Sequence, residues 1–257
     1  MPVLVTGATG CIGRALVPAL VKTGGQVRVY VRREAPEYRA MGVKVAMGDA
    51  DHEGRIESAL EQVHTLVHLV GGPLVEGLTT IEWLNIETTR VALRAAENAG
   101  VRRVIFVSHL GANEWSDHLY LVTKARAEEA VRNAPMEHVI LRCAPVIGEG
   151  SVFSGFIESG VVRGAHRLAP LAVADVAAAV VAADTREAEL RGTWELCGPD
   201  LLTLDELSRG ANPKRGLGRI FSGPPKALTS LYSRDFVADA TDAVRQFGLN
   251  LTPVKWV

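Results

Sequence analysis

The 257-residue sequence predicts an α/β protein: a doubly wound parallel sheet with a small C-terminal cap. Short β-branched apolar runs alternate with longer helical patterns through the first two-thirds of the chain, which is typical of such a sheet. A glycine-rich turn follows the first apolar run. After about residue 150 the alternation loosens. We therefore expect residues 1–150 to form the sheet core, and residues 151–257 to complete the sheet edge and form a cap over the substrate.

Six strands are expected in the core, because six short apolar runs are flanked by Gly, Asp or polar residues. They cover 2–6, 26–31, 43–47, 65–70, 103–108 and 138–142. Helical patterns lie between them at 11–23, 53–62, 79–99 and 116–133. The pattern at 79–99 is the clearest, since Thr79 or Thr80 can cap its start and Gly100 ends it.

The pattern is weaker in the C-terminal third. A helix is expected at 172–184, a short strand in GTWELCG (192–198) and a helix near 203–210. The stretch GANPKRGLG (210–218) has the composition of a loop. Residues 218–257 show weak periodicity, so no element is assigned to them.

Composition excludes several function classes. The formal net charge of −1 gives no electrostatic footprint for nucleic acid. No apolar run approaches the roughly 18 residues of a spanning helix, so no membrane insertion is expected. Cys11, Cys143 and Cys197 form no CxxC motif and the N-terminus lacks a signal-peptide pattern, which favours a cytoplasmic protein. No metal site is expected, because His64 and His68 lack a third ligand. The sequence leaves the oligomeric state open.

The glycines of TGATGCIG (6–13) predict a dinucleotide site. In a strand–turn–helix unit the amides of the turn and of the first helical turn lack partners, and the helix dipole adds positive charge, so a pyrophosphate fits. Gly7 would permit the tight turn, Gly10 would let the backbone approach the phosphates, and Gly13 would let the helix pack closely on the sheet. The expected sheet is therefore Rossmann-type; a purely structural glycine turn is the alternative.

Two arginines follow the second strand, in VYVRRE (29–34). An NAD-specific site usually carries a carboxylate here, bonded to the ribose 2′-hydroxyl. The guanidinium groups of Arg32 and Arg33 instead suit a 2′-phosphate by charge and geometry. The cofactor expected is therefore NADP(H) in preference to NAD(H). Solvated arginines, or an inward-turned Glu34, are the alternatives.

The segment YLVTK (120–124) places Tyr120 and Lys124 on one face of a helix, one turn apart. A phenol with a pKa near 10 is a poor acid–base catalyst at neutral pH, and a nearby ammonium lowers that pKa. An ordinary surface pair is the alternative. Ser108 closes the fifth strand, at the edge where ligands bind, and its hydroxyl could hold a substrate carbonyl while Tyr120 exchanges a proton. Serine is also common at strand ends because it caps the next turn.

Four segments together resemble the short-chain dehydrogenase/reductase superfamily: TGATGCIG, FVSHLGA, YLVTKARAEEAV and LRCAPVIGEG. The resemblance covers roughly residues 1–200. It is narrower to the atypical and extended branches, which include nucleoside-diphosphate-sugar epimerase-like proteins and relatives of the nucleotide-binding accessory subunit of respiratory complex I.

The resemblance implies a role for each matching residue. Tyr120 would be the acid–base, and Lys124 would bind the nicotinamide ribose and lower the pKa of Tyr120. The remaining cofactor contacts follow the chain: Gly7, Thr9, Gly10, Cys11, Ile12 and Gly13 at the pyrophosphate; Arg32 and Arg33 at the adenosine ribose; Asp49 and Ala50 at the adenine; Val70, Gly71 and Gly72 beside the nicotinamide ribose; and Cys143, Ala144, Pro145 and Val146 at the nicotinamide.

Two functions remain open from the sequence. The first is an NAD(P)-dependent oxidoreductase or epimerase-like enzyme that transfers hydride to or from a small carbonyl or carbinol substrate, with Ser108, Tyr120 and Lys124 as the catalytic set. The second is a non-catalytic NAD(P)-binding redox sensor or assembly subunit. Cys143 stands where relatives usually have Pro, and the short tail after residue 200 disfavours a bulky nucleotide-sugar substrate. A small-molecule substrate is the partner expected.

Overall fold

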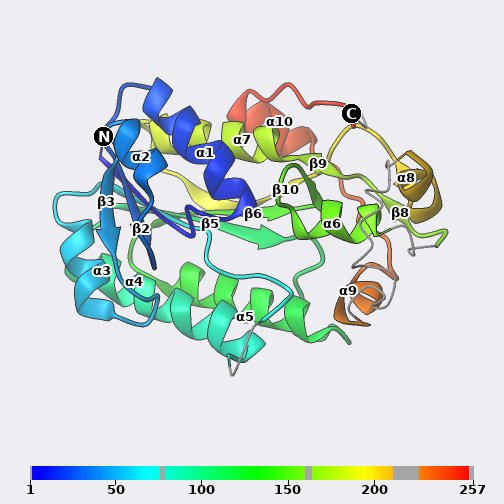
Figure 1. Ribbon diagram of the computed structural model, residues 1–257, viewed down its shortest axis with the longest axis horizontal. Coiled ribbons are helices and arrows are strands. Elements are labelled where there is room, and N and C mark those ends of the chain that lie inside the picture. The colour runs from blue at the N-terminus through cyan, green and yellow to red at the C-terminus, as the bar shows by residue number, and fades with distance from the viewer. Residues whose placement is uncertain (1, 76–78, 160–163, 211–225, 255–257) are drawn as a thin grey trace.

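The computed structural model describes residues 2–75, 79–159, 164–210 and 226–254. A parallel sheet runs through the centre, and helices cover both of its faces (Figure 1). The expected α/β, Rossmann-type fold class is confirmed. Of the loop expected at 210–218, all but Gly210 lies outside the described residues.

Seven parallel strands form the main sheet, in the order β10-β6-β5-β4-β1-β2-β3. Six of them are the strands that the sequence predicts, within one or two residues: β1 (Val3–Thr6), β2 (Val27–Val31), β3 (Lys44–Met47), β4 (Thr65–His68), β5 (Arg103–His109) and β6 (Glu137–Cys143). The seventh, β10 (Arg191–Leu196), contains most of the short strand expected in GTWELCG and pairs in parallel with β6.

The strand order reverses between β1 and β4, which pair in parallel with Thr6 opposite His68. The chain builds β2 and β3 to one side of β1, and then β4, β5 and β6 to the other. In open parallel sheets, ligands bind in the crevice outside the carboxyl ends of the strands at such a reversal. The glycine turn after β1 lies at this crevice.

Helices α1 (Cys11–Lys22) and α7 (Val173–Thr185) pack together on one face of the sheet (Figure 1). Helices α3 (Glu53–Leu60), α4 (Thr88–Asn98) and α5 (Leu119–Asn133) cover the other face. All five were expected from the sequence. The helix α2 (Pro36–Ala40) was not, because five residues are too few to show a periodicity.

The segment expected as one helix at 79–99 contains a π-helical turn, η1 (Trp83–Glu87), that leads directly into α4. A π-turn inserts an extra residue into the helical repeat, and such turns occur frequently at functional sites. The turn carries Asn85, whose side chain is 1% exposed.

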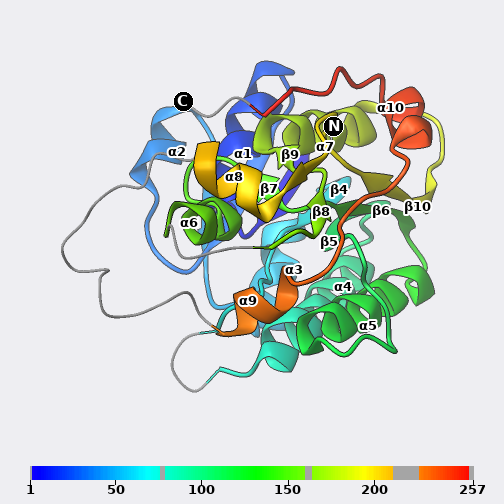
Figure 2. The ribbon, with the colours of Figure 1, turned by 90° about the vertical axis from the view of Figure 1, so that its right-hand side faces the viewer.

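Among its described residues, the C-terminal part contains two small sheets and four further helices. Strand β7 (Val146–Ile147) pairs with β9 (Leu171–Ala172), and β8 (Arg167–Leu168) pairs with β11 (Leu202–Thr203). The helices are α6 (Val152–Glu158), the expected α8 (Leu204–Gly210), α9 (Lys226–Leu231) and α10 (Thr241–Phe247). Figure 2 shows α6, α8 and α9 gathered at one side of the sheet. The division at residue 150 stays a prediction.

Within the described ranges, no helix combines the length and the apolar character that a membrane span requires.

Candidate functional site

A different steric requirement explains each glycine of the turn between β1 and α1. Gly7 has φ +70, in the left-handed region, and a Cβ there would lie 2.8 Å from the carbonyl carbon of Leu69. A Cβ on Gly13 would lie 2.3 Å from the carbonyl oxygen of Ala8. Gly13 thus lets α1 pack on the turn itself, rather than on the sheet as expected. A Cβ on Gly10 would meet only the Gly7 carbonyl oxygen, at 3.3 Å, so the backbone there is open to a ligand.

The N-terminus of α1 fits the pyrophosphate of a dinucleotide. Gly10 is its N-cap residue and supplies no side-chain cap, and the first turn carries no acidic residue. The amide groups of that turn are therefore free to bind an anion, and the helix dipole favours negative charge there. The first turn of α1 therefore suits the pyrophosphate that the glycine motif predicts.

The loop after β4 is held by Asn85. The Asn85 Nδ2 donates to the carbonyl oxygens of Gly72, at 3.0 Å, and Ile81, at 2.9 Å. Its Oδ1 accepts from the amide of Gly72 at 3.0 Å. Gly71 has φ +141, and a Cβ there would lie 2.7 Å from the Asn85 Oδ1. The π-turn thus positions Gly71 and Gly72, which face the glycine turn across the crevice.

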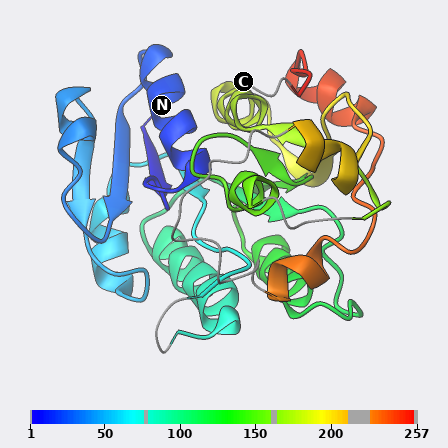
Figure 3. The ribbon, with the colours of Figure 1, turned by 45° about the vertical axis from the view of Figure 1, so that its right-hand side comes forward.

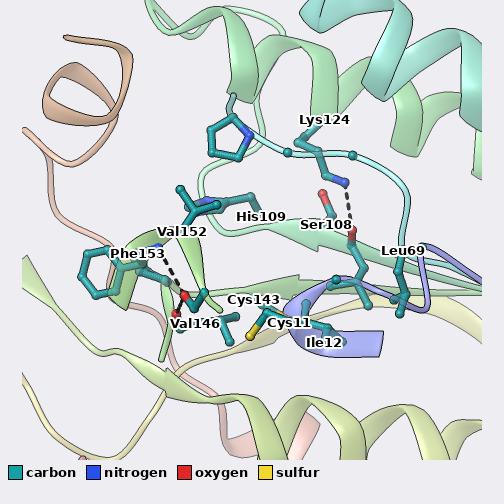
Figure 4. Close-up of a pocket in the computed structure, with 18 of the residues that line it drawn as sticks. Cys11, Ile12, Leu69, Ser108, His109, Lys124, Cys143, Val146, Val152 and Phe153 are labelled. Atoms are coloured by element: carbon teal, nitrogen blue, oxygen red, sulfur yellow. Dashed lines mark hydrogen bonds between the residues drawn. The ribbon is translucent and has the colours of Figure 1, made fainter. Parts of the chain in front are cut away.

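A cavity of about 300 Å³ connects the glycine turn to α5 (Figure 4). Most residues of the predicted site line it: Gly7, Gly10, Cys11, Ile12, Gly13, Gly71, Gly72, Ser108, Tyr120, Lys124, Cys143, Ala144, Pro145 and Val146. Six predicted residues do not: Thr9, Arg32, Arg33, Asp49, Ala50 and Val70. Nine further residues line it that are not among the predicted catalytic and cofactor residues: Leu69, Pro73, Val107, His109, Gly150, Ser151, Val152, Phe153 and Tyr232. The roles of the predicted residues stay predictions.

Tyr120 and Lys124 lie one turn apart on α5, and both are buried in the wall of the cavity. The Lys124 Nζ donates to the Val107 carbonyl oxygen at 2.8 Å, and it lies 4.1 Å from the centroid of the Phe106 ring. Burial lowers the pKa of Lys124 to about 8. The Tyr120 hydroxyl makes no hydrogen bond within the part of the chain that the structure describes.

The structure does not bring about the expected lowering of the Tyr120 pKa by Lys124. Burial raises the pKa of Tyr120, Cys143 raises it further, and Lys124 is not among the groups that shift it. Desolvation of the phenolate dominates, because it disfavours the charged form of a buried phenol. Tyr120 is therefore a protonated donor at neutral pH.

Ser108 makes a buried contact with helix α5. Its Oγ donates to the Glu128 Oε1 at 2.5 Å. The Glu128 side chain is fully buried and also forms ion pairs with Arg142, at 2.7 Å, and Arg132, at 3.2 Å. A serine hydroxyl has a single proton to donate. The Ser108 proton is thus bound to Glu128 rather than presented to a substrate carbonyl.

His109 follows Ser108 at the end of β5 and, like Ser108, contacts a residue of α5. Its ring meets the Tyr120 ring edge-on, with centroids 5.5 Å apart. The Nδ1 donates to the Leu110 carbonyl oxygen at 2.7 Å, since a carbonyl can only accept. Burial lowers the pKa of His109 to about 4, so the ring is neutral at pH 7. Figure 4 shows His109 and Ser108 in the same wall of the cavity.

The residues predicted at the adenosine lie outside the cavity, at the ends of β2 and β3. Arg32 and Arg33 are exposed, and neither makes an ion pair with a residue that the structure describes. Glu34 binds Arg39 through both carboxylate oxygens, each at 3.2 Å. The backbone oxygen of Asp49 accepts from the Tyr30 hydroxyl at 3.0 Å, which leaves the Asp49 carboxylate exposed.

Residues 7–185 match the model of a protein family described as NAD(P)H-binding. The match spans more than half of the chain, so the protein belongs to this NAD(P)H-binding family. The membership agrees with the predicted resemblance to the atypical and extended short-chain dehydrogenase/reductases.

Two curated relatives have different activities in their names. The chain is 35% identical to NADH dehydrogenase [ubiquinone] 1 alpha subcomplex subunit 9 of Arabidopsis thaliana, a mitochondrial protein, over 79% of this chain and 55% of the relative. It is 33% identical to the ceramide reductase of Caulobacter vibrioides, over 96% of this chain and 81% of the relative. The chain thus spans only about half the length of the first relative.

Solved structures share the fold. The structure of MoeE5 in complex with UDP-glucuronic acid and NAD has a TM-score of 0.78 and is 20% identical, covering 99% of this chain and 95% of that one. At this identity the likeness concerns the fold alone.

Proposed function

We propose that the protein is an NAD(P)-dependent reductase that transfers hydride between the nicotinamide C4 and a carbonyl or carbinol carbon. One observation carries the proposal. Tyr120 and Lys124 line the same cavity as the glycine turn, although more than 100 residues separate them in the chain. The nicotinamide coenzyme would supply or accept the hydride, while the protein binds, orients and moves the proton.

Tyr120 would donate the proton to the substrate oxygen. Its hydroxyl has no partner among the described residues, and its raised pKa keeps the proton in place until an oxygen with developing negative charge arrives. Lys124, with a pKa of about 8, would remain an ammonium at pH 7 and present its other protons to the coenzyme ribose.

Ser108 takes a different part from the one that the motif predicts. Because its proton is donated to Glu128, Ser108 would hold the end of β5 against α5 rather than orient the substrate. The predicted Ser108–Tyr120–Lys124 set is therefore reduced here to Tyr120 and Lys124, with Ser108 in support.

NADP(H) is proposed as the preferred coenzyme. Arg32 and Arg33 have no ion-pair partner among the described residues, whereas the carboxylate of Glu34 is occupied by Arg39. The end of β2 thus offers free positive charge, while the carboxylate that directly follows the two arginines, that of Glu34, is occupied. Asp49 and Ala50 would lie against the adenine.

The substrate is proposed to be a carbonyl compound with an apolar part. Leu69, Val152 and Phe153 line the same cavity as Tyr120, and a relative that is 33% identical over 96% of this chain is named for reduction of a ceramide. Val152 and Phe153 lie within residues 151–257, which supports the proposed cap. We keep a cytoplasmic location as part of the proposal, although the Arabidopsis relative is mitochondrial.

A non-catalytic assembly subunit is the second candidate. It is favoured by the 35% identity to a subunit of NADH dehydrogenase and by the Lys124 ammonium, which already binds the Val107 carbonyl oxygen. In that case the bound coenzyme would stabilise a larger assembly without turnover.

Turnover separates the two candidates. The purified protein is incubated with NADPH or NADH and a panel of aldehydes and ketones, and oxidation of the coenzyme is followed by absorbance. We expect turnover in the wild type, and a loss of about a hundred-fold or more in kcat for Tyr120→Phe with nearly unchanged coenzyme affinity. A protein that binds coenzyme tightly, turns over no panel member and is insensitive to Tyr120→Phe supports the assembly subunit instead.

A further inference from the structure

A second phenol lines the cavity. Tyr232 is 3% exposed and follows α9, far from the other site residues in the sequence. Its ring packs against Phe153, with centroids 4.7 Å apart, and against Phe156, at 5.1 Å. Its hydroxyl makes no hydrogen bond within the described part of the chain. The hydroxyl oxygen is not one of the fully buried polar atoms that lack a partner in the described chain, so it is open to the cavity and can donate to a ligand there.

The segment that carries Tyr232 is fixed to the start of α5. The Nε2 of His118 donates to the Ala227 carbonyl oxygen at 2.9 Å, and Arg234 forms an ion pair with Asp117 at 2.6 Å. Figures 2 and 3 both show α9 beside the green helix α5. On the far side of Tyr232, the amide of Phe236 donates to the Arg167 carbonyl oxygen at 2.9 Å. The phenol is thus held in place from both sides.

Tyr120 and Tyr232 are close enough to influence each other electrostatically. A charge on Tyr120 raises the pKa of Tyr232, which burial already raises. Both phenols therefore stay protonated at neutral pH, and both are donors. Their rings are also linked through shared neighbours. The His109 ring contacts the rings of Tyr120 and Phe236. The Phe236 ring in turn faces the Tyr232 ring, with centroids 6.1 Å apart.

The other two hydroxyls of the cavity are already committed. Ser108 donates to Glu128, and Ser151 donates to the Val146 carbonyl oxygen. Among the residues that line the cavity, Tyr120 and Tyr232 are thus the hydroxyl donors without a protein acceptor in the described chain. A carbonyl oxygen has two lone pairs and can accept from both at once.

We propose that Tyr232 donates a second hydrogen bond to the substrate carbonyl oxygen that Tyr120 protonates. The proposal rests on the reductase function proposed above. In reduction the carbonyl carbon gains the hydride, the π electron pair of the C=O bond moves to the oxygen, and the oxygen takes the proton of Tyr120. Tyr232 keeps its proton and stabilises the oxygen while its charge develops, as donors in a water-poor site do. Tyr120 then recovers a proton from solvent.

The two phenols also define a substrate class. The oxygen between them must be a carbonyl oxygen, and the cavity also has apolar side chains, of which Phe153 contacts the Tyr232 ring and Val152 lines the wall. An aliphatic aldehyde or ketone fits this arrangement, with its alkyl chain along the α6 side of the cavity. An aliphatic amide offers the same oxygen without being reduced, and it therefore serves as a binding probe.

Two readouts test the proposal in wild type, Tyr232→Phe and Tyr120→Phe. The first is kcat and KM with medium-chain aliphatic aldehydes and ketones. The second is calorimetric affinity for a medium-chain N-methylamide, measured on the protein saturated with oxidised coenzyme. We expect Tyr232→Phe to lower both kcat/KM and amide affinity by about ten-fold or more. Coenzyme affinity and thermal stability should stay at their wild-type values, because the Tyr232 hydroxyl makes no hydrogen bond to a described residue that the substitution would remove.

Phe156→Leu is the matched control, since Phe156 contacts the same ring but does not line the cavity. It should lower stability and leave amide affinity nearly unchanged. If Tyr232→Phe keeps the activity and the amide affinity of the wild type, Tyr232 is not a second hydrogen-bond donor to the substrate. If the wild type reduces no carbonyl compound but Tyr232→Phe still weakens amide binding, the reductase function fails and the two-donor site stands. If the wild type neither reduces carbonyls nor binds the amide, both fail.

Discussion

Asn85 binds the backbone of Gly72 through both groups of its side-chain amide. The Nδ2 donates to the Gly72 carbonyl and the Oδ1 accepts from the Gly72 amide, each at 3.0 Å. Gly72, in the loop after β4, is thereby attached to the π-turn η1. Because Gly72 lines the cavity, this pair of bonds holds part of the wall of the crevice in which a coenzyme would lie.

Replacing Asn85 with Ala should therefore affect both stability and coenzyme binding. The variant leaves the half-buried amide and carbonyl of Gly72 without their side-chain partner, which costs about 1–2 kcal/mol in the free energy of unfolding. Coenzyme affinity should fall as well, since the loop is no longer held. Urea unfolding and fluorescence titration with NADPH measure the two effects.

The matched control is Asn98→Ala on the same helical segment. The Asn98 side chain is exposed and bonds only Glu57, so its loss should change neither quantity appreciably. Equal effects of the two substitutions would show that the Gly72 bonds are not what holds the loop.

The strands and the coenzyme loop could be predicted from the sequence because their signals are local. A parallel sheet buried on both faces gives continuous apolar runs, and the glycine spacing reports the steric needs of one short turn. His109 directly follows Ser108 at the carboxyl end of β5, so its place at the ligand edge of the sheet could also be predicted.

Tyr232 could not be predicted in the same way. It reaches the cavity through α9, and its position depends on contacts between residues more than 100 apart, such as Arg234 with Asp117. Neither a motif nor a periodicity marks such a residue. The π-turn was equally hidden, because its extra residue leaves the apolar spacing of 79–99 readable as an ordinary helix.

The double substitution Arg32→Ala with Arg33→Ala should change coenzyme preference. A guanidinium that binds the 2′-phosphate contributes a charge-assisted hydrogen bond, so NADPH affinity should fall by about ten- to hundred-fold. NADH lacks that phosphate, and its affinity should change little. Calorimetry with both coenzymes provides the measurement, and Arg126→Ala, an exposed arginine of α5, is the control. Equal losses for NADPH and NADH would contradict the charge argument.

Gly13→Ala should disrupt the coenzyme turn. The added methyl would lie 2.3 Å from the Ala8 carbonyl oxygen, and backbone must move to relieve the clash. We expect a loss of about 1–3 kcal/mol in stability together with weaker coenzyme binding. Gly54→Ala in α3 is matched to it, since a Cβ there meets nothing within 4 Å, and it should stabilise by about 0.5 kcal/mol. A fully stable Gly13→Ala protein with normal affinity would show that α1 can shift freely on the turn.

The buried ammonium of Lys124 should give the stability of the protein a defined pH dependence. Burial lowers its pKa from 10.5 to about 8. Below about pH 8 both the folded and the unfolded chain hold the proton, and the folded state carries the full cost of the buried charge. Between about pH 8 and 10.5 the unfolded chain binds a proton that the folded chain has lost, so the contribution of Lys124 to the free energy of unfolding rises with pH.

Lys124→Met removes that contribution while keeping an unbranched side chain at the site. Other groups titrate in both proteins and cancel in the difference, so the free energy of unfolding of the wild type minus that of the variant should rise by about 3 kcal/mol across this window. Urea unfolding followed by circular dichroism at a series of pH values measures the difference. Lys226→Met, on the exposed side of α9, should leave the difference flat. A flat difference for Lys124→Met as well would mean that the ammonium keeps its proton through the window, and that Lys124 enters the site with the pKa of an ordinary lysine.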